Sequence, residues 1–343
     1  MTIFRGMITG IGSLPYTNAD DAVDLVLKYC PQAPFWPQLP KIGAREGMCA
    51  QFSEHLPALA LQDNALVFDS RRQDDELEEF YKRLISEDVD YFSISPEYAA
   101  GLYAFYRRLE KKMPSGIEFI KCHITGPFTF AAGLSDDSGK SLVYDTVFMQ
   151  ALVKGLAMKA RWQIDFFRKF GREMIVFIDE PYLAGFGSAY TAINRQDIIQ
   201  DLTELTSIIK PNGAMVGVHC CGNTDWSIFT DTPGIDIINF DAFDFLDKIL
   251  LYADNLKAFF GRGGALCWGI APTQEFNKSL KAQVLLDKID QGVAALEKKG
   301  LERAVILKNM LLSPACGLGT LTPDKAEGIF ALLAEVSEQL RSR

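Results

Sequence analysis

Eight short apolar runs alternate with longer amphipathic stretches along this chain of 343 residues, and this alternation constrains the fold more than any other feature. Each run is typical of a buried strand, whereas the stretches between runs repeat apolar residues every three or four positions, as helices do. Eight strands that alternate with helices predict a (β/α)8 TIM barrel rather than an open sheet. The runs span residues 6–14, 90–96, 119–127, 174–181, 214–220, 235–241, 265–272 and 304–312.

The length and composition suit one large hydrophobic core. Hydrophobic residues make up 48% of the chain, and α/β barrels of this size commonly form one domain, so we expect a single TIM-barrel domain over residues 1–343. A long irregular insertion is expected near residues 28–64. Long loops in compact domains often carry function.

The charge pattern argues against two classes of partner. Lys and Arg total 35 against 44 Asp and Glu, and no basic run interleaves with aromatic residues, so we expect no nucleic acid partner. No stretch of 18 apolar residues and no secretory signal is present, so we expect a cytoplasmic protein without a membrane partner. The seven cysteines form an odd set, which favours metal binding or burial over disulfides.

Polar side chains gather where the apolar runs end. The carboxyl ends of barrel strands meet at one face, where TIM-barrel active sites are built. A histidine alone at such a position is more often a structural residue, and we interpret His123 in that way. The residues at these ends are Ser13, His123, Asp179, Glu180, His219, Cys221, Asp241 and Cys316.

A pair of residues in one run, and a cysteine after another, indicate a metal site. His219 and Cys221 are two positions apart and therefore share a strand face, while Cys220 points away. Cys316 follows a different run. Imidazole and thiolate are ligands that Zn²⁺ prefers, so we predict a catalytic zinc ion at the mouth of the barrel.

Five sequence strings carry a family resemblance. They are GIGSLP, TGPFTF, FIDEP, HCC followed by IINFD, and SPACGLGT. Together they resemble the C-terminal catalytic barrel of cobalamin-independent methionine synthase, within the superfamily that includes uroporphyrinogen decarboxylase and corrinoid-dependent methyltransferases. The strings occur in the family's order over nearly the whole chain, as a short single-barrel form.

The resemblance implies a ligand set and a substrate site. The implied zinc ligands are His219, Cys221, Asp241 and Cys316. Asp241 stands where the synthase has Glu, and Asp244 is an alternative fourth ligand. The string Ile11-Gly12-Ser13 is implied to hold the substrate, and Asp179 to face its amino group. Asp179 and Glu180 are the candidate catalytic residues; the alternative for this pair is a solvated loop or a helix N-cap.

Two departures from the family concern the substrates. Ala131-Ala132-Gly133 stand where the synthase has a folate-region tryptophan, and Ala50-Gln51 where it has a second substrate-binding acid. We also expect no synthase-like N-terminal half, because 343 residues leave no room for a second barrel. We therefore expect a methyl donor other than folate, namely a corrinoid co-substrate, free or bound to a carrier protein.

These observations predict a zinc-dependent thiol methyltransferase of methionine biosynthesis. It would transfer a methyl group from the non-folate donor to a zinc-bound small-molecule thiol such as homocysteine. One alternative is a lyase like uroporphyrinogen decarboxylase, which would need a cationic cleft that the acidic strand ends do not supply. The other is a barrel that binds metal or thiols without catalysis.

Overall fold

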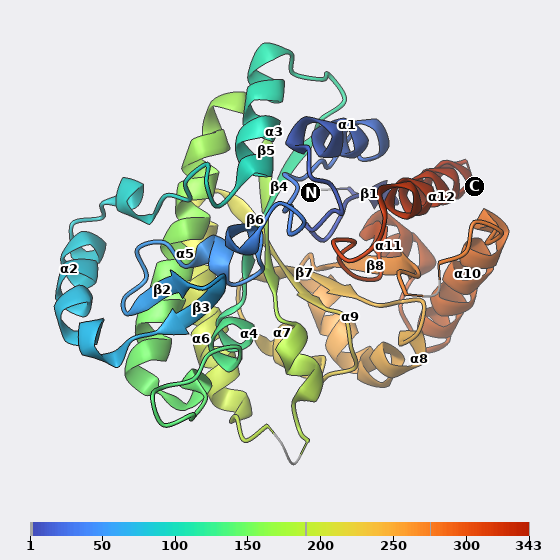
Figure 1. Ribbon diagram of the computed structural model, residues 1–343. Helices are drawn as coiled ribbons and strands as arrows, with labels where there is room; N and C mark the ends of the chain where they lie inside the picture. Colours follow the sequence, from blue (N-terminus) through green and yellow to red (C-terminus); the bar gives the residue numbers. More distant parts are fainter. Residues whose placement is uncertain (1–2, 189–190, 275, 343) are drawn as a thin grey trace.

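A parallel sheet of seven strands forms the centre of the computed structural model, which describes residues 3–188, 191–274 and 276–342. The strand order is β1-β9-β8-β7-β6-β5-β4, so neighbours in the chain are neighbours in the sheet and β1 lies beside β9. The sheet is curled, and its long helices lie around the outside (Figure 1). The α/β class and the parallel sheet are therefore as predicted.

Each strand end is followed by a loop or a helix that returns the chain to the start of the next strand. The strands are β1 (Met7–Ile8), β2 (Leu59–Gln62), β3 (Ala65–Phe68), β4 (Phe119–Thr125), β5 (Glu173–Asp179), β6 (Ala214–Cys220), β7 (Ile235–Phe240), β8 (Ala265–Ala271) and β9 (Met310–Pro314). The α-helices are α1 (Ala19–Tyr29), α2 (Gln73–Ile85), α3 (Ala100–Lys111), α4 (Pro127–Ala132), α5 (Thr146–Phe167), α6 (Arg195–Ile209), α7 (Ser227–Asp231), α8 (Leu246–Ile249), α9 (Ala253–Gly261), α10 (Ala282–Lys298), α11 (Arg303–Lys308) and α12 (Pro323–Arg341).

Three of the eight predicted strands differ from the structure. The run at 90–96 is wrong as a strand, because Val89–Phe92 form a 3-10 helix. Phe92 and Ile94 of this run are buried, but Phe92 packs its ring against Phe80 of α2, 5.5 Å between centroids, rather than within a sheet. The run at 304–312 begins as helix α11 and becomes a strand only at Met310, and the run at 6–14 supplies only the two residues of β1.

A segment inside the predicted irregular region connects the two edges of the sheet. Residues 32–38 form isolated parallel bridges, from Phe35 to Lys121 of β4 and from Gln38 to Ser13 beyond β1. Prolines at 34 and 37 lack the N–H that a continuous ladder needs, so the described residues form bridges here instead of an eighth strand. The same region also contains β2, which pairs with β3 in a small antiparallel sheet that we did not predict.

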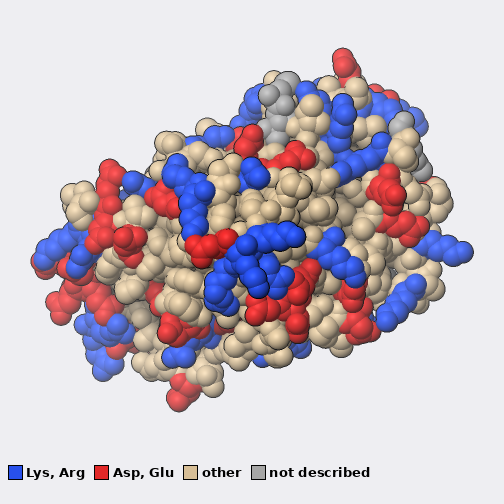
Figure 2. Space-filling model, turned by 90° about the horizontal axis from the view of Figure 1, so that it is seen from above, with Lys and Arg blue, Asp and Glu red and all other residues tan. Residues whose placement is uncertain are grey.

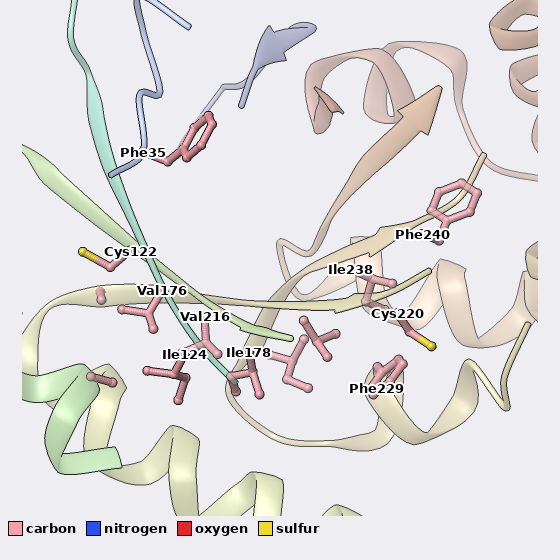
Figure 3. Close-up of a cluster of buried hydrophobic side chains, with 14 of the residues drawn as sticks. Phe35, Cys122, Ile124, Val176, Ile178, Val216, Cys220, Phe229, Ile238 and Phe240 are labelled. Atoms are coloured by element: carbon pink, nitrogen blue, oxygen red, sulfur yellow. The ribbon is translucent and has the colours of Figure 1, made fainter. Parts of the chain in front are cut away.

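The two faces of the sheet have different cores. On the inner face, Phe119, Ile175, Phe177, Ile237 and Leu311 belong to one buried cluster. The outer face packs against the helices; Figure 3 shows Cys122, Ile124, Val176, Val216 and Cys220 among its buried side chains. Cys122 and Cys220 are thus core residues, as the sequence indicated.

The surface carries interspersed charges of both signs. Over the face seen in Figure 2, Lys and Arg alternate with Asp and Glu. Among the described residues, no helix is both long enough and apolar enough to cross a bilayer.

The close contact between α3 and segment 32–38 generates a first prediction. A Cβ added to Gly101 would lie 1.8 Å from the carbonyl oxygen of Pro37, and a backbone atom cannot easily move away. We expect Gly101→Ala to lower the free energy of unfolding by about 1–3 kcal/mol, although alanine has a higher helix propensity than glycine. Thermal unfolding followed by circular dichroism measures this change.

The matched control is Gly261→Ala, also in a helix, where an added Cβ meets nothing within 4 Å. This variant should be neutral or slightly stabilised. A Gly101→Ala protein as stable as Gly261→Ala would contradict the described packing.

Candidate metal centre

Three potential metal ligands converge at the carboxyl end of the sheet. His219 lies near the end of β6, Cys221 follows that strand, and Cys316 follows β9. Their ligand atoms all lie within 4.8 Å of one another. Tetrahedral zinc with bonds of about 2.0–2.3 Å separates its ligand atoms by roughly 3.5–3.8 Å, so the three side chains are close to the spacing that zinc requires.

A hydrogen-bond network fixes the orientation of His219. The amide nitrogen of Asn239 donates to the carbonyl oxygen of Cys267 and to Oγ of Ser313, both at 2.9 Å. Its amide oxygen therefore faces Nδ1 of His219, which is hydrogen-bonded to it. Because an amide oxygen only accepts, Nδ1 carries the proton and Nε2 is left as the ligand atom.

Asn239 was not among the residues that we singled out from the sequence. The sequence did contain a signal, since Asn239 lies two positions before Asp241 in the same predicted run, 235–241. Asparagine in an apolar run has several structural explanations, however, and only the register of β6 with β7 shows its contact with His219.

The two cysteines of the centre share one hydrogen bond. Donation from Cys221, together with the nearby His219, lowers the pKa of Cys316 against the opposing effect of burial. The same hydrogen bond and burial raise the pKa of Cys221. Cys316 and Asp179 in turn raise the pKa of His219, although burial opposes its charged form. The site thus favours one thiolate at neutral pH.

Asp241, the predicted fourth ligand, lies outside this group of three. Its Oδ1 accepts hydrogen bonds from the backbone N–H groups of Phe243 and Asp244, both at 2.9 Å. Burial and the neighbouring Asp244 raise the pKa of Asp241 to about 6. Asp241 and Asp244 line a second cavity of about 330 Å³ together with Cys221 and Cys316, so metal ligation by Asp241 or Asp244 stays a prediction.

A larger cavity, the main cavity, brings most predicted site residues together. Its volume is about 570 Å³, within the usual range for small-molecule sites. The residues that line it are Ile11, Ser13, Gln38, Pro40, Lys41, Met48, Asp179, Pro181, His219, Cys221, Cys316, Gly317, Gly319 and Thr320. The predicted metal ligands and substrate-binding residues therefore share one space, except for Gly12 and Asp241.

The predicted Ile11-Gly12-Ser13 string has three different environments. Ile11 and Ser13 line the main cavity, and Oγ of Ser13 accepts a hydrogen bond of 3.3 Å from Gly319 N. Gly12 instead lies against His123, since a Cβ added to Gly12 would be 2.9 Å from the imidazole ring of His123. Gly12 is therefore placed for close packing and not for lining the cavity.

Asp179 presents an unsatisfied carboxylate oxygen. The side chain lines the main cavity, is 8% exposed, and its Oδ1 has no hydrogen-bond partner among the described residues. Burial raises its pKa, whereas Lys121 and His219 favour the ionised form. A buried acceptor without a partner is costly and is suited to receive a hydrogen bond from a ligand.

Glu180, the other predicted catalytic residue, has a different place. Its carboxylate accepts hydrogen bonds from the backbone N–H groups of Phe128 and Thr129, at 3.0 and 2.8 Å, and from Oγ1 of Thr129 at 2.6 Å. Both oxygens are thus occupied at the start of α4, and Glu180 is not among the residues that line the main cavity. These contacts resemble the capping alternative, and a catalytic role of Glu180 stays a prediction.

Two sets of residues that depart from the family pattern lie away from the main cavity. Ala131 is buried in α4, and none of Ala131, Ala132 and Gly133 lines the main or the second cavity. Gln51 is fully buried and bonded to Glu46 and Gln38 instead of facing the cavity.

His123 is buried and packs against aromatic rings. Its ring stacks on Trp36 with 3.9 Å between centroids. Neither ring nitrogen has a hydrogen-bond partner among the described residues. Burial and the nearby Lys121 hold the pKa of His123 well below its ordinary value, so the ring is neutral.

Lys121 is a buried cation that sequence reasoning missed. Its Nζ donates to the carbonyl oxygen of Ile11 and lies 4.4 Å from the ring centroid of Phe177. Burial lowers the pKa of Lys121 to about 8, and the opposing attraction of Asp179 is weaker. The inner face of the sheet thus holds a cation near the unsatisfied carboxylate of Asp179.

The buried lysine generates a prediction about pH. Below pH 8 Lys121 is protonated in both the folded and the unfolded chain, so the full cost of burying its charge is present. Between about pH 8 and 10.5 the folded state releases its proton first, so the cost falls. We therefore expect the free energy of unfolding of the native protein to rise with pH over this range, by roughly 1–3 kcal/mol relative to that of Lys121→Met.

Urea unfolding of both proteins between pH 7 and 10 measures this difference, because other titrating groups cancel in the comparison. Parallel stability curves for the two proteins would show that Lys121 does not titrate in this range.

The three converging ligands generate a prediction about metal content. Protein prepared under reducing, zinc-replete conditions should hold one zinc ion per chain, and Cys221→Ser and Cys316→Ser should lose it. Asn239→Ala should retain zinc with about 10–100-fold weaker affinity, because His219 loses its orienting partner. Elemental analysis and competition with a chelator measure both effects.

Cys49→Ser is the matched control, since Cys49 is also partly exposed but lies outside the cluster. Zinc retained at full affinity in Cys316→Ser would refute the assignment of this ligand.

Comparisons with known proteins place the fold beside methionine synthases that do not use vitamin B12. No family model matches the chain, and no curated protein matches it. A solved structure of a B12-independent methionine synthase from Shewanella sp. W3-18-1, in complex with selenomethionine, is 15% identical, with 98% of each chain covered and a TM-score of 0.57. A putative vitamin-B12-independent methionine synthase from Listeria monocytogenes is 13% identical, with 94% of this chain and 86% of that chain covered and a TM-score of 0.56. The predicted resemblance is therefore confirmed for the fold over nearly the whole chain.

Proposed function

We propose that this protein is a zinc-dependent thiol methyltransferase that resembles methionine synthase. The observation that carries the proposal is the cluster of His219, Cys221 and Cys316 in the wall of the cavity that also presents Asp179. One imidazole and two thiols with ligand atoms within 4.8 Å form a donor set that suits zinc. The likeness in fold to B12-independent methionine synthases supports the same reading.

The residues that would hold zinc are the three clustered ligands, with Asp241 as the proposed fourth. Oδ1 of Asp241 is occupied by two backbone N–H groups, so Oδ2 is the oxygen that remains for a metal. Bound zinc would lower the pKa of a thiol substrate and so supply a nucleophilic sulfur at neutral pH.

The chain's own side chains would position the acceptor. Asp179 offers its unsatisfied Oδ1 to an amino group of the substrate. Ser13, whose Oγ accepts a hydrogen bond from Gly319 N in the loop after Cys316, also lines the cavity. During transfer, the acceptor sulfur forms a bond to the methyl carbon while the bond from that carbon to the donor breaks, and the donor keeps the electron pair. Positioning of the two reactants supplies much of the acceleration.

The cavities around the cysteine pair are consistent with a reaction of two substrates. Cys221 and Cys316 line both the main cavity and the second cavity, so the pair can be approached from two sides. We propose a non-folate donor, a methylated corrinoid that is free or bound to a carrier protein. A corrinoid is larger than the main cavity, so it would present its methyl group from outside.

The composition of the main cavity favours this proposal over a lyase that binds several carboxylates. Lys41 is the only lysine or arginine that lines it in the described part of the chain. Only a measurement of turnover distinguishes the proposed enzyme from a barrel that binds metal without catalysis.

The test of the proposal is methyl transfer to homocysteine by the zinc-loaded protein. We expect turnover with methylcobalamin or a methylated corrinoid protein, and none with methyl-tetrahydrofolate, including its polyglutamylated form. Methionine formation, measured by mass spectrometry, should fall at least about 100-fold in Cys316→Ser, because the thiol is no longer activated.

Cys49→Ser, which leaves the cluster intact, should retain the activity. Efficient folate-dependent methylation would contradict the proposed donor, whereas turnover that persists undiminished in Cys316→Ser would contradict the proposed metal chemistry.

A further inference from the structure

Gln38 lies in the wall of the main cavity on a firmly held piece of backbone. Its N–H donates to the carbonyl oxygen of Gly12 at 3.0 Å, and its own carbonyl oxygen accepts from Leu14 N at 2.9 Å. The residue is 8% exposed and lines the cavity that contains Ser13 and the metal cluster. Its side chain is therefore a defined part of this wall.

A chain of hydrogen bonds determines which end of the Gln38 amide faces the cavity. The amide nitrogen of Gln51 donates to Oε2 of Glu46 at 2.9 Å and to the carbonyl oxygen of Tyr98 at 2.8 Å. A carboxylate and a carbonyl oxygen can only accept, so the nitrogen of Gln51 must point toward them. Its oxygen then faces Gln38, whose amide nitrogen donates to it at 2.9 Å.

The start of this chain is anchored in the buried carboxylate of Glu46. The backbone N–H groups of Leu39 and Ala100 donate to it at 3.1 and 2.6 Å, and the side chain is 1% exposed. Each group in the network has one acceptable orientation, since reversing either amide would place two acceptors or two donors face to face. The oxygen of Gln38 is therefore the group that its side chain has left to offer to the cavity.

The main cavity thus has two oxygen acceptors among its lining residues. One is the oxygen of Gln38, and the other is the unsatisfied Oδ1 of Asp179. Asp179 also carries the charge of a carboxylate. A hydrogen-bond donor with positive charge matches this pair better than a neutral or anionic group does.

We propose that Gln38 is a specificity-determining residue that accepts a hydrogen bond from the ammonium group of the proposed aminothiol substrate. This inference rests on the proposed function, because the thiol is taken to bind at the metal cluster. Gln51 and Glu46 act as positioning residues that prevent the Gln38 amide from turning its nitrogen toward the ligand.

The experiment compares two thiols that differ only in the amino group, homocysteine and 4-mercaptobutanoate. Cobalt-loaded protein is titrated with each, and the sulfur-to-cobalt absorption band and calorimetry give the dissociation constants. We expect the native protein to bind homocysteine about 10–100-fold more tightly than 4-mercaptobutanoate. Gln38→Met should remove about tenfold or more of this preference and leave 4-mercaptobutanoate binding unchanged.

Three further variants make the result specific. Gln51→Met should reduce the preference in the same direction, because the Gln38 amide is free to turn. Asp179→Asn should also reduce it, as the other acceptor. Lys41→Met, the matched control in the same cavity, should affect the two thiols equally, since both carry the carboxylate. The absorption bands of bound cobalt before thiol addition verify that each variant retains the metal site.

Equal weakening of both thiols in Gln38→Met, or unchanged homocysteine binding, would overturn the inference while the proposed function stands. If neither thiol binds the cobalt of the native protein, the proposed function fails and the inference fails with it.

Discussion

The parallel register of β5, β6 and β7 is the constraint on which the candidate metal centre depends. It pairs Asp179 with His219, and His219 with Asn239, so that three polar side chains from three strands meet at one level of the inner face. Alternation along each strand sends the apolar neighbours, such as Ile178 and Val218, to the helix-covered face. A shift of register by one residue would exchange these faces and remove the site.

Burial of charged side chains above the apolar inner core costs free energy, and packing alone does not explain why they are there. Lys121 and Asp179 are both buried, and for both the largest influence on the pKa is the loss of hydration. Their mutual attraction offsets part of this loss, but Oδ1 of Asp179 still lacks a partner among the described residues. Such incompletely satisfied groups are expected where a ligand completes the network, because a purely structural core would replace them with apolar side chains.

An irregular segment supplies one side of the cavity. Residues 32–38 bridge both edges of the sheet, and the prolines at 34 and 37 prevent a regular strand. This backbone is held instead by α3, where Gly101 allows the carbonyl of Pro37 to approach closely. The result is a fixed position for Gln38, which joins the cavity to the Glu46 network.

Two features could be predicted from the sequence, namely the parallel α/β arrangement and the convergence of His219, Cys221 and Cys316. Periodicity predicts strands because burial acts on local pattern, and the spacing of His219 and Cys221 follows from the two-residue repeat of a strand. Only the tertiary structure shows that Glu180 binds the start of α4, that Asn239 contacts His219, and that the Gln38 amide donates to Gln51. These roles depend on hydrogen bonds between residues far apart in the chain, and local pattern carries no information about which partner a polar side chain will meet.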